Sequence, residues 1–215
     1  MKSIKHDKYK SMEKSHEYYY KLAVKNGTCP CGDGSILELV IKAGTISYLN
    51  KLIERYNIKS ISDCPCGLYE NWIFKLDLPK KDVKYIGYDI NPSAIKRNKK
   101  MFSEIDFVKF NMCNEILPKT DLIICRDCLF HLPNDFIIET LNNFKKSKST
   151  YLLATSQDQI KVNLDLSPNE LKVGAGNRCI NLEIEPFNMG EPLEIHDETS
   201  IDDRGLRSML LWKIN

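Results

Sequence analysis

Two acidic residues lie at the ends of short apolar runs. Asp63 follows the run Ile58–Ser62, and Asp89 lies near the end of the run Lys84–Ile90. A carboxylate at the end of a second parallel strand can accept hydrogen bonds from both hydroxyls of an adenosine ribose. A carboxylate after the first strand can face the amino and sulfonium groups of a cationic nucleoside. This spacing favours a nucleoside cofactor.

The turn after Asp63 selects among nucleoside cofactors. A dinucleotide needs a Gly-x-Gly-x-x-Gly turn to hold its pyrophosphate, but here Gly67 is followed by Leu68, Tyr69 and Glu70. A Walker loop is absent as well, because neither Gly-Lys-Ser nor Gly-Lys-Thr occurs in the sequence. S-adenosylmethionine, which carries no phosphate, fits this pattern better.

A histidine and a carboxylate follow a third apolar run. His131 comes four residues after Asp127, so the two side chains share one face if a helix has begun there. A neutral imidazole can accept the proton of an alcohol while a carboxylate fixes its tautomer. Arg126 is a candidate for orienting the acceptor. A structural interpretation stays open, in which His131 caps the corner between strand and helix and Arg126 only pairs with Asp127.

The elements that position these residues alternate along the chain. The predicted strands are Ile58–Ser62, Lys84–Ile90, Ile105–Phe110, Leu122–Cys125, Tyr151–Ala154 and Met209–Ile214. Helices are predicted over 1–26, 46–56, 93–101 and 134–145, the third introduced by an Asn91–Pro92 cap. Alternation at this spacing predicts right-handed crossovers and a mainly parallel, doubly wound sheet, with the last strand at an edge.

Composition bounds the class of protein. The 215 residues carry 31 Lys and Arg against 29 Asp and Glu, so no basic field indicates a nucleic-acid partner. The sequence has neither an apolar run of transmembrane length nor an apolar segment near its start, so we expect a cytoplasmic protein without membrane contact. The eight cysteines should then be free thiols.

Two Cys-Pro-Cys-Gly segments, Cys29–Gly32 and Cys64–Gly67, raise the alternative of a four-thiolate zinc site. A single proline between the thiols makes it hard to aim both at one tetrahedral ion. We therefore expect no metal there. The acidic segment Glu191–Asp203 is a second metal alternative, with a charged surface loop as its ordinary interpretation.

Several segments in order resemble a known family. They are Ile61–Gly67, Asn71–Trp72, Tyr85–Ile90 and the stretch Asp121–Leu132, which contains Arg-Asp-Cys-Leu-Phe-His-Leu. Together they resemble class I S-adenosylmethionine-dependent methyltransferases, in a small subgroup with that last motif that is often associated with glycans. The resemblance also covers an entry loop at Gly32–Ser35 and a late substrate-side segment over 181–193.

The resemblance implies a Rossmann-like sheet of seven strands, mainly parallel, with helices on both faces and an antiparallel C-terminal strand. It also implies S-adenosylmethionine as methyl donor, S-adenosylhomocysteine as product and a hydroxyl of a saccharide or similar small molecule as acceptor. Residues 1–57 would form a helical lid or entry segment, and 58–215 the cofactor-binding core; a solvated N-terminal helix with its tyrosines toward the core is the alternative to the lid. The expected cofactor contacts are Asp63, Cys64, Gly67, Trp72, Asp89, Ile90, Asn111, Met112 and Arg126, and the expected catalytic residues are His131, Asp127 and Arg126.

Two positions depart from the family pattern. The turn after Asp63 is one residue longer, with Glu70 a candidate replacement for a lost carboxylate, and the third strand ends in Asn111 instead of Asp. An amide can still meet an adenine edge. Two further hypotheses stay open: an RNA or protein acceptor docked by the basic N-terminal segment, and a methyltransferase fold that binds without catalysis.

Overall fold

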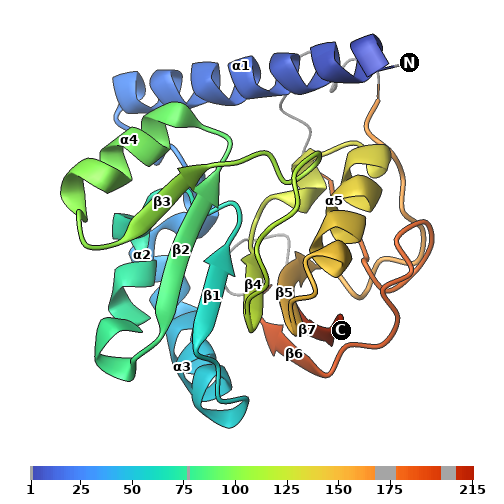
Figure 1. Ribbon diagram of the computed structural model, residues 1–215. Helices are drawn as coiled ribbons and strands as arrows, with labels where there is room; N and C mark the ends of the chain where they lie inside the picture. Colours follow the sequence, from blue (N-terminus) through green and yellow to red (C-terminus); the bar gives the residue numbers. More distant parts are fainter. Residues whose placement is uncertain (1, 77, 168–177, 200–206) are drawn as a thin grey trace.

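A computed structural model describes residues 2–76, 78–167, 178–199 and 207–215 (Figure 1). The helices are α1 (Lys2–Asn26), α2 (Leu37–Lys42), α3 (Thr45–Arg55), α4 (Pro92–Met101) and α5 (Asn134–Lys146). The strands are β1 (Ser60–Asp63), β2 (Lys84–Asp89), β3 (Asp106–Lys109), β4 (Leu122–Cys125), β5 (Tyr151–Ser156), β6 (Glu194–Asp197) and β7 (Ser208–Lys213). A short 3₁₀ helix, Leu129–His131, follows β4.

The seven strands form one sheet in the order β3-β2-β1-β4-β5-β7-β6. The first five strands pair in parallel, whereas β7 is antiparallel to both β5 and β6. The strand order reverses between β1 and β4, which is where an open α/β sheet binds its ligand. The prediction of a mainly parallel, seven-stranded sheet with an antiparallel C-terminal strand is confirmed. The prediction that the last strand lies at an edge is wrong, because β6 pairs with the other side of β7 and forms the edge itself.

Alternating side chains of the buried strands divide the core into two layers. Ile123 of β4 packs with α5 residues such as Ile137 on one face, and the neighbouring Ile124 packs with Leu49 of α3 on the other. Helices therefore cover both faces, as predicted. Residues of α2 and α3 belong to the same core as the sheet, since Val40 and Leu49 are fully buried within it.

Local signals explain most of the boundaries. The Asn91 side chain caps α4 by accepting hydrogen bonds from the backbone N–H groups of Ser93, at 2.9 Å, and Ala94, at 3.2 Å, and Pro92 is the first helical residue. Helix α2 was not predicted, because six residues between two loop segments give too little periodicity to read. Strand β6 lies in the acidic segment that was expected to be a surface loop.

Helix α1 lies across the carboxyl ends of the parallel strands, above β1 and β2 and beside α4 (Figure 1). Three contacts fix it there. Glu17 accepts a hydrogen bond from the Ser93 hydroxyl at 2.6 Å, the Asn91 side chain donates to the carbonyl of His16, and Lys109 pairs with Glu13. Among the described residues, no helix is long and apolar enough to cross a membrane.

Candidate functional site

A cavity of about 450 Å³ opens at the carboxyl ends of β1, β2 and β4, beneath α1. Its position follows from the sheet topology, because the loops after β1 and β4 separate at the strand-order reversal. Every residue predicted to contact the cofactor or to act in catalysis lines this cavity: Asp63, Cys64, Gly67, Trp72, Asp89, Ile90, Asn111, Met112, Arg126, Asp127 and His131.

Asp89 ends β2 and is held by backbone groups from two directions. One carboxylate oxygen accepts the N–H of Gly67 at 2.9 Å, and the other accepts the N–H of Asn91 at 2.8 Å. Burial raises the pKa of Asp89, and these backbone hydrogen bonds act in the opposite direction. Gly67 has a φ of +53°, a conformation that favours glycine. In this conformation the turn after β1 places the Gly67 N–H on the Asp89 carboxylate.

Asp63 ends β1 and is 3% exposed. Its carboxylate accepts a hydrogen bond from the Tyr85 hydroxyl at 2.7 Å. Burial raises the pKa of Asp63 to about 7. A buried carboxylate with such a pKa is poised to interact with a cationic ligand group, which would favour its ionised form.

Asn111 and Met112 follow β3 at the far side of the cavity. The side-chain oxygen Oδ1 of Asn111 accepts the backbone N–H of Cys113 at 3.0 Å, and the backbone N–H of Asn111 donates to the Glu115 carboxylate at 2.7 Å. Asn111 therefore closes a turn at the end of β3 and also lines the cavity, so a role in the turn does not exclude a role in binding the cofactor.

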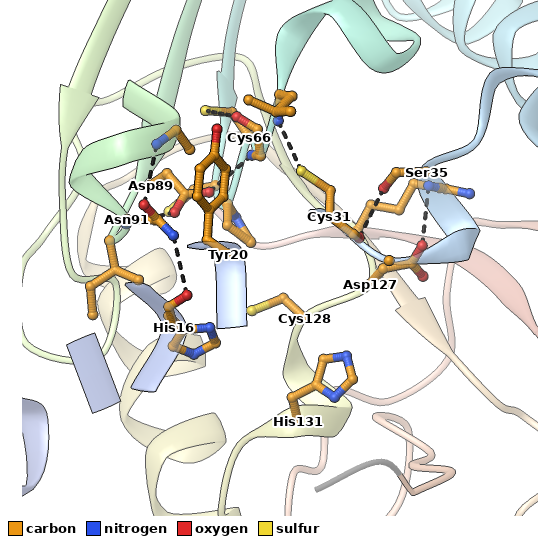
Figure 2. A pocket seen from close by; sticks show the side chains of 18 of the residues that line it. His16, Tyr20, Cys31, Ser35, Cys66, Asp89, Asn91, Asp127, Cys128 and His131 are labelled. Atoms are coloured by element: carbon orange, nitrogen blue, oxygen red, sulfur yellow. Dashed lines mark hydrogen bonds and ion pairs between the residues drawn. The ribbon is translucent and has the colours of Figure 1, made fainter. Parts of the chain in front are cut away.

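The loop after β4 does not have the geometry predicted for it. Asp127 has a φ of +54°, and helical structure begins only at Leu129. Asp127 and His131 therefore do not share a helical face, and the expectation that they do was wrong. In Figure 2 the Asp127 carboxylate lies near Ser35, apart from the His131 imidazole, which is in ring contact with Phe130 at 4.4 Å between centroids.

Asp127 instead belongs to a buried ion network. It pairs with Arg126 at 3.1 Å and with Arg207, and Glu198 pairs with Arg126 at 3.2 Å and with Arg207 at 3.1 Å. Thr45 donates a hydrogen bond to Glu198, which is fully buried. Arg126 therefore does pair with Asp127, as the structural alternative expected. Glu198 is buried in this network and does not belong to a charged surface loop.

Sequence reasoning missed the partners Glu198 and Arg207. They come together with Arg126 only through the pairing of β7 with β5 and β6, and no local pattern predicts such a contact. It also missed His16, which lines the cavity from α1. Burial lowers the pKa of His16, so its imidazole is neutral at neutral pH. Figure 2 shows His16 and Tyr20 on the side of the cavity near Asn91.

Two other expectations find no support in the lining of the cavity. Glu70 does not replace a carboxylate in the turn, because it pairs with Arg97 and does not line the cavity. The segment 181–193 contributes no lining residue either; Leu182 and Phe187 are buried in the core, and the Asn181 side chain donates to the carbonyls of Asp158 and Ile160. Position 203 of the acidic segment lies outside the described residues.

The two Cys-Pro-Cys-Gly segments lie close together, but as hydrogen-bonded thiols. The Leu68 N–H donates to the Cys31 sulfur at 3.2 Å, and the Asn71 side chain donates to the Cys29 sulfur at 3.6 Å. All eight cysteines are free, and burial raises the pKa of Cys31 to about 12. Within the described part of the chain, no group of His, Cys, Asp or Glu is arranged to hold a metal ion.

Comparison with solved structures places this arrangement in a known fold. An O-methyltransferase family protein from Burkholderia thailandensis matches with a TM-score of 0.56, 12% identity and 81% of this chain covered. Magnesium protoporphyrin IX methyltransferase from Synechocystis with bound SAH (S-adenosylhomocysteine) matches with a TM-score of 0.54, 14% identity and 79% coverage. The fold is the Rossmann-like methyltransferase fold.

Human N-acetylserotonin methyltransferase, solved in complex with SAM (S-adenosylmethionine), shares this methyltransferase fold with a TM-score of 0.52, 12% identity and 80% coverage. The chain spans 82% of the Synechocystis enzyme, 56% of the Burkholderia protein and 55% of the human enzyme. No protein-family model and no curated protein sequence matches the chain.

Proposed function

We propose that this protein transfers the methyl group of S-adenosylmethionine to a hydroxyl of a small molecule. The observation that carries the proposal is the position of Asp89. Its carboxylate lies at the end of β2, held by the Gly67 turn and the start of α4, in a cavity at the reversal of the strand order. That is where an open α/β sheet binds an adenosine moiety.

The residues around the cavity fit this cofactor. The Asp89 carboxylate accepts backbone N–H groups, among them those of Gly67 and Asn91, and a carboxylate offers about four lone-pair sites, so acceptor capacity remains for a ribose hydroxyl. Asp63 would face the cationic end of the cofactor. Asn111 and Met112 line the wall after β3, where the adenine would lie, and Cys64, Trp72 and Ile90 complete the lining.

S-adenosylmethionine supplies a methyl group on an activated sulfonium leaving group. The protein would contribute position, exclusion of water and a proton acceptor. His131 is the candidate base that removes the hydroxyl proton, because it lines the cavity after β4 and a neutral imidazole can accept a proton. Arg126 and Asp127 would then shape the site and orient the acceptor.

Within the predicted lid and entry segment 1–57, we further propose that α1 and the loop after it act as the lid and entry, whereas α2 and α3 pack into one core with the sheet of 58–215. Helix α1 contributes Met12, His16, Tyr19 and Tyr20 to the cavity wall, and the entry loop contributes Gly32 and Ser35. A cavity of about 450 Å³ falls within the range of small-molecule sites, which supports a compact acceptor such as a saccharide more than a macromolecule.

Calorimetric titration with S-adenosylhomocysteine tests the proposal. We expect binding by the full chain, weaker by about 100-fold or more in Asp89→Ala, since two hydrogen bonds to a charged group would be lost. NAD is the control ligand and should not bind. Heat without loss in the variant would place the ligand elsewhere. Absence of heat from a folded protein would contradict the proposal.

A further inference from the structure

The Arg178 guanidinium joins three separate parts of the chain: the loop after β4, the start of α5 and the loop after β5. Its Nη1 donates to the carbonyl of Phe130 at 3.2 Å, its Nη2 to the side-chain oxygen of Asn134 at 2.7 Å, and its Nε to the carbonyl of Leu164 at 2.8 Å. The Arg178 side chain is 11% exposed. A planar group that uses all three of its nitrogens cannot turn without breaking a hydrogen bond, so its position is fixed.

The backbone that carries Arg178 is itself anchored beside the end of β5. Two residues further on, the Ile180 N–H donates to the Gln157 side chain at 2.8 Å, and the Gln157 N–H donates to the Ile180 carbonyl at 2.8 Å. Ile180 is fully buried in the core. Arg178 therefore reaches the loop after β4 from a base that the sheet holds in place.

The contact with Phe130 lies next to the candidate base. The Phe130 carbonyl belongs to the peptide group that links Phe130 to His131, and the N–H of the same peptide group donates to the carbonyl of Cys128 at 2.9 Å. Because a peptide group is planar, these two hydrogen bonds fix it from opposite ends. Its orientation helps to set the direction in which the His131 side chain leaves the backbone, and His131 lines the cavity.

We infer that Arg178 is a positioning residue for His131: through the Phe130 carbonyl it fixes the peptide group before His131 and so directs the imidazole into the cavity. The inference rests on the proposed function, in which His131 removes the proton of the acceptor hydroxyl. A base must lie within hydrogen-bond reach of that proton, and misplacement by about 1 Å can lower a rate by about 100-fold. Arg178 acts from outside the set of described residues that line the cavity.

A purely structural role at α5 is the alternative. Asn134 is the first residue of α5, and Pro133 before it gives no side-chain cap, so Arg178 could serve only to hold the start of this helix. The two roles use different nitrogens, since Nη2 contacts Asn134 and Nη1 contacts Phe130. Asn134→Ala removes the first contact and keeps the second, which makes it the matched control.

NMR of the imidazole groups in the full chain tests the inference, because the sequence has four histidines and substitution assigns each signal. In the ligand-free unmodified protein, the His131 signal should differ from its position in urea. Arg178→Gln should move this signal toward the position in urea, whereas Asn134→Ala should leave it in place. The signal of His196, which lies on β6, should stay unchanged in both variants and show that they are folded.

Turnover should change by the same route. The assay follows methyl transfer from radiolabelled S-adenosylmethionine to a panel of free hexoses. Arg178→Gln should lower kcat by about 10- to 100-fold with unchanged affinity for S-adenosylhomocysteine. Combined with His131→Ala, the same substitution should cause no further loss, since a residue that acts through another is not additive with it.

The other outcomes separate the inference from the proposed function. An unmoved His131 signal in Arg178→Gln overturns the inference, as does an equal movement in Asn134→Ala or a further loss of kcat in the double variant. If Arg178→Gln is unfolded, Arg178→Lys replaces it, because a lysine cannot hold three acceptors in one plane and should move the signal as well. Absence of S-adenosylhomocysteine binding contradicts the proposed function, and transfer to none of the hexoses contradicts a simple sugar as acceptor. In both cases the His131 signal, measured without ligand, still decides whether Arg178 positions this residue.

Discussion

The two halves of the cavity hold buried carboxylates in opposite electrostatic states. After β1 and β2, Asp63 and Asp89 accept hydrogen bonds from a hydroxyl and from backbone N–H groups, and among the described residues neither carboxylate is in an ion pair. After β4, Asp127 is paired with two arginines inside the protein, as is Glu198 beside it. The first half therefore lacks a cation that a ligand can supply, whereas the second half is neutralised by the fold itself.

The pKa values follow this difference. Burial raises the pKa of Asp63 to about 7 and also raises that of Asp89. Burial acts on Glu198 in the same direction, but Arg126 and Arg207 outweigh it, and the pKa of Glu198 lies below its ordinary value. Burial therefore raises the pKa of the carboxylates after β1 and β2, whereas the arginines keep the buried carboxylate of Glu198 ionised.

The largest effect should come from breaking the neutralised half. Glu198→Ala leaves Arg126 and Arg207 each without one buried partner, and we expect it to lower the free energy of unfolding by about 3–5 kcal/mol. Urea unfolding at pH 7 measures this. Glu54→Ala, which removes an exposed partner of Lys81, is the control and should change the midpoint little. Equal midpoints for the two variants would show that the network is not structural.

Replacing Asp63, in the half of the cavity without an ion pair, should raise the free energy of unfolding instead of lowering it. Because the pKa of Asp63 rises from 3.8 to about 7 on folding, the unfolded state loses its proton first, and stability falls as the pH rises between these values. Asp63→Asn should therefore stabilise the ligand-free protein at pH 8 by about 2–4 kcal/mol, since one pKa unit is worth about 1.4 kcal/mol. At pH 4 the variant and the unmodified protein should unfold at similar urea concentrations. A variant less stable at pH 8 would contradict the poised state of Asp63.

The smallest expected effect comes from a pair of variants after β4, which distinguishes a catalytic role of His131 from a structural role of Asp127. His131→Ala should lower turnover by about 100-fold with unchanged affinity for S-adenosylhomocysteine, since a base acts on the acceptor. Asp127→Asn should mainly lower stability, because Asp127 belongs to the ion network. Methyl transfer to an identified acceptor, followed together with urea unfolding, measures both. Full turnover in His131→Ala would assign the histidine to structure and leave His16 as the next candidate base.

Much of the fold could be predicted from the local sequence pattern. Apolar runs placed six of the seven strands, and the Asn91–Pro92 cap placed the start of α4, because these signals depend on neighbouring residues alone. Strand β6 lacks such a signal: its side chains alternate between half-buried and exposed, and its pairing with β7 places it in the sheet.

The candidate site was predictable only in part. Asp63, Gly67 and Asp89 could be found because strand ends of a parallel sheet meet at one edge. The geometry of Asp127 could not, since the left-handed conformation of one residue decides whether Asp127 and His131 share a face. Glu198 and Arg207 reach Arg126 across a distance of more than 70 residues in sequence, which no spacing rule covers.

A crystal structure of the protein with S-adenosylhomocysteine tests the central claim most directly. The account predicts density in the cavity under α1, with the ribose hydroxyls on Asp89 and the amino-acid end of the ligand toward Asp63. Adenosine density outside this cavity, or within it but away from Asp89, would contradict the account.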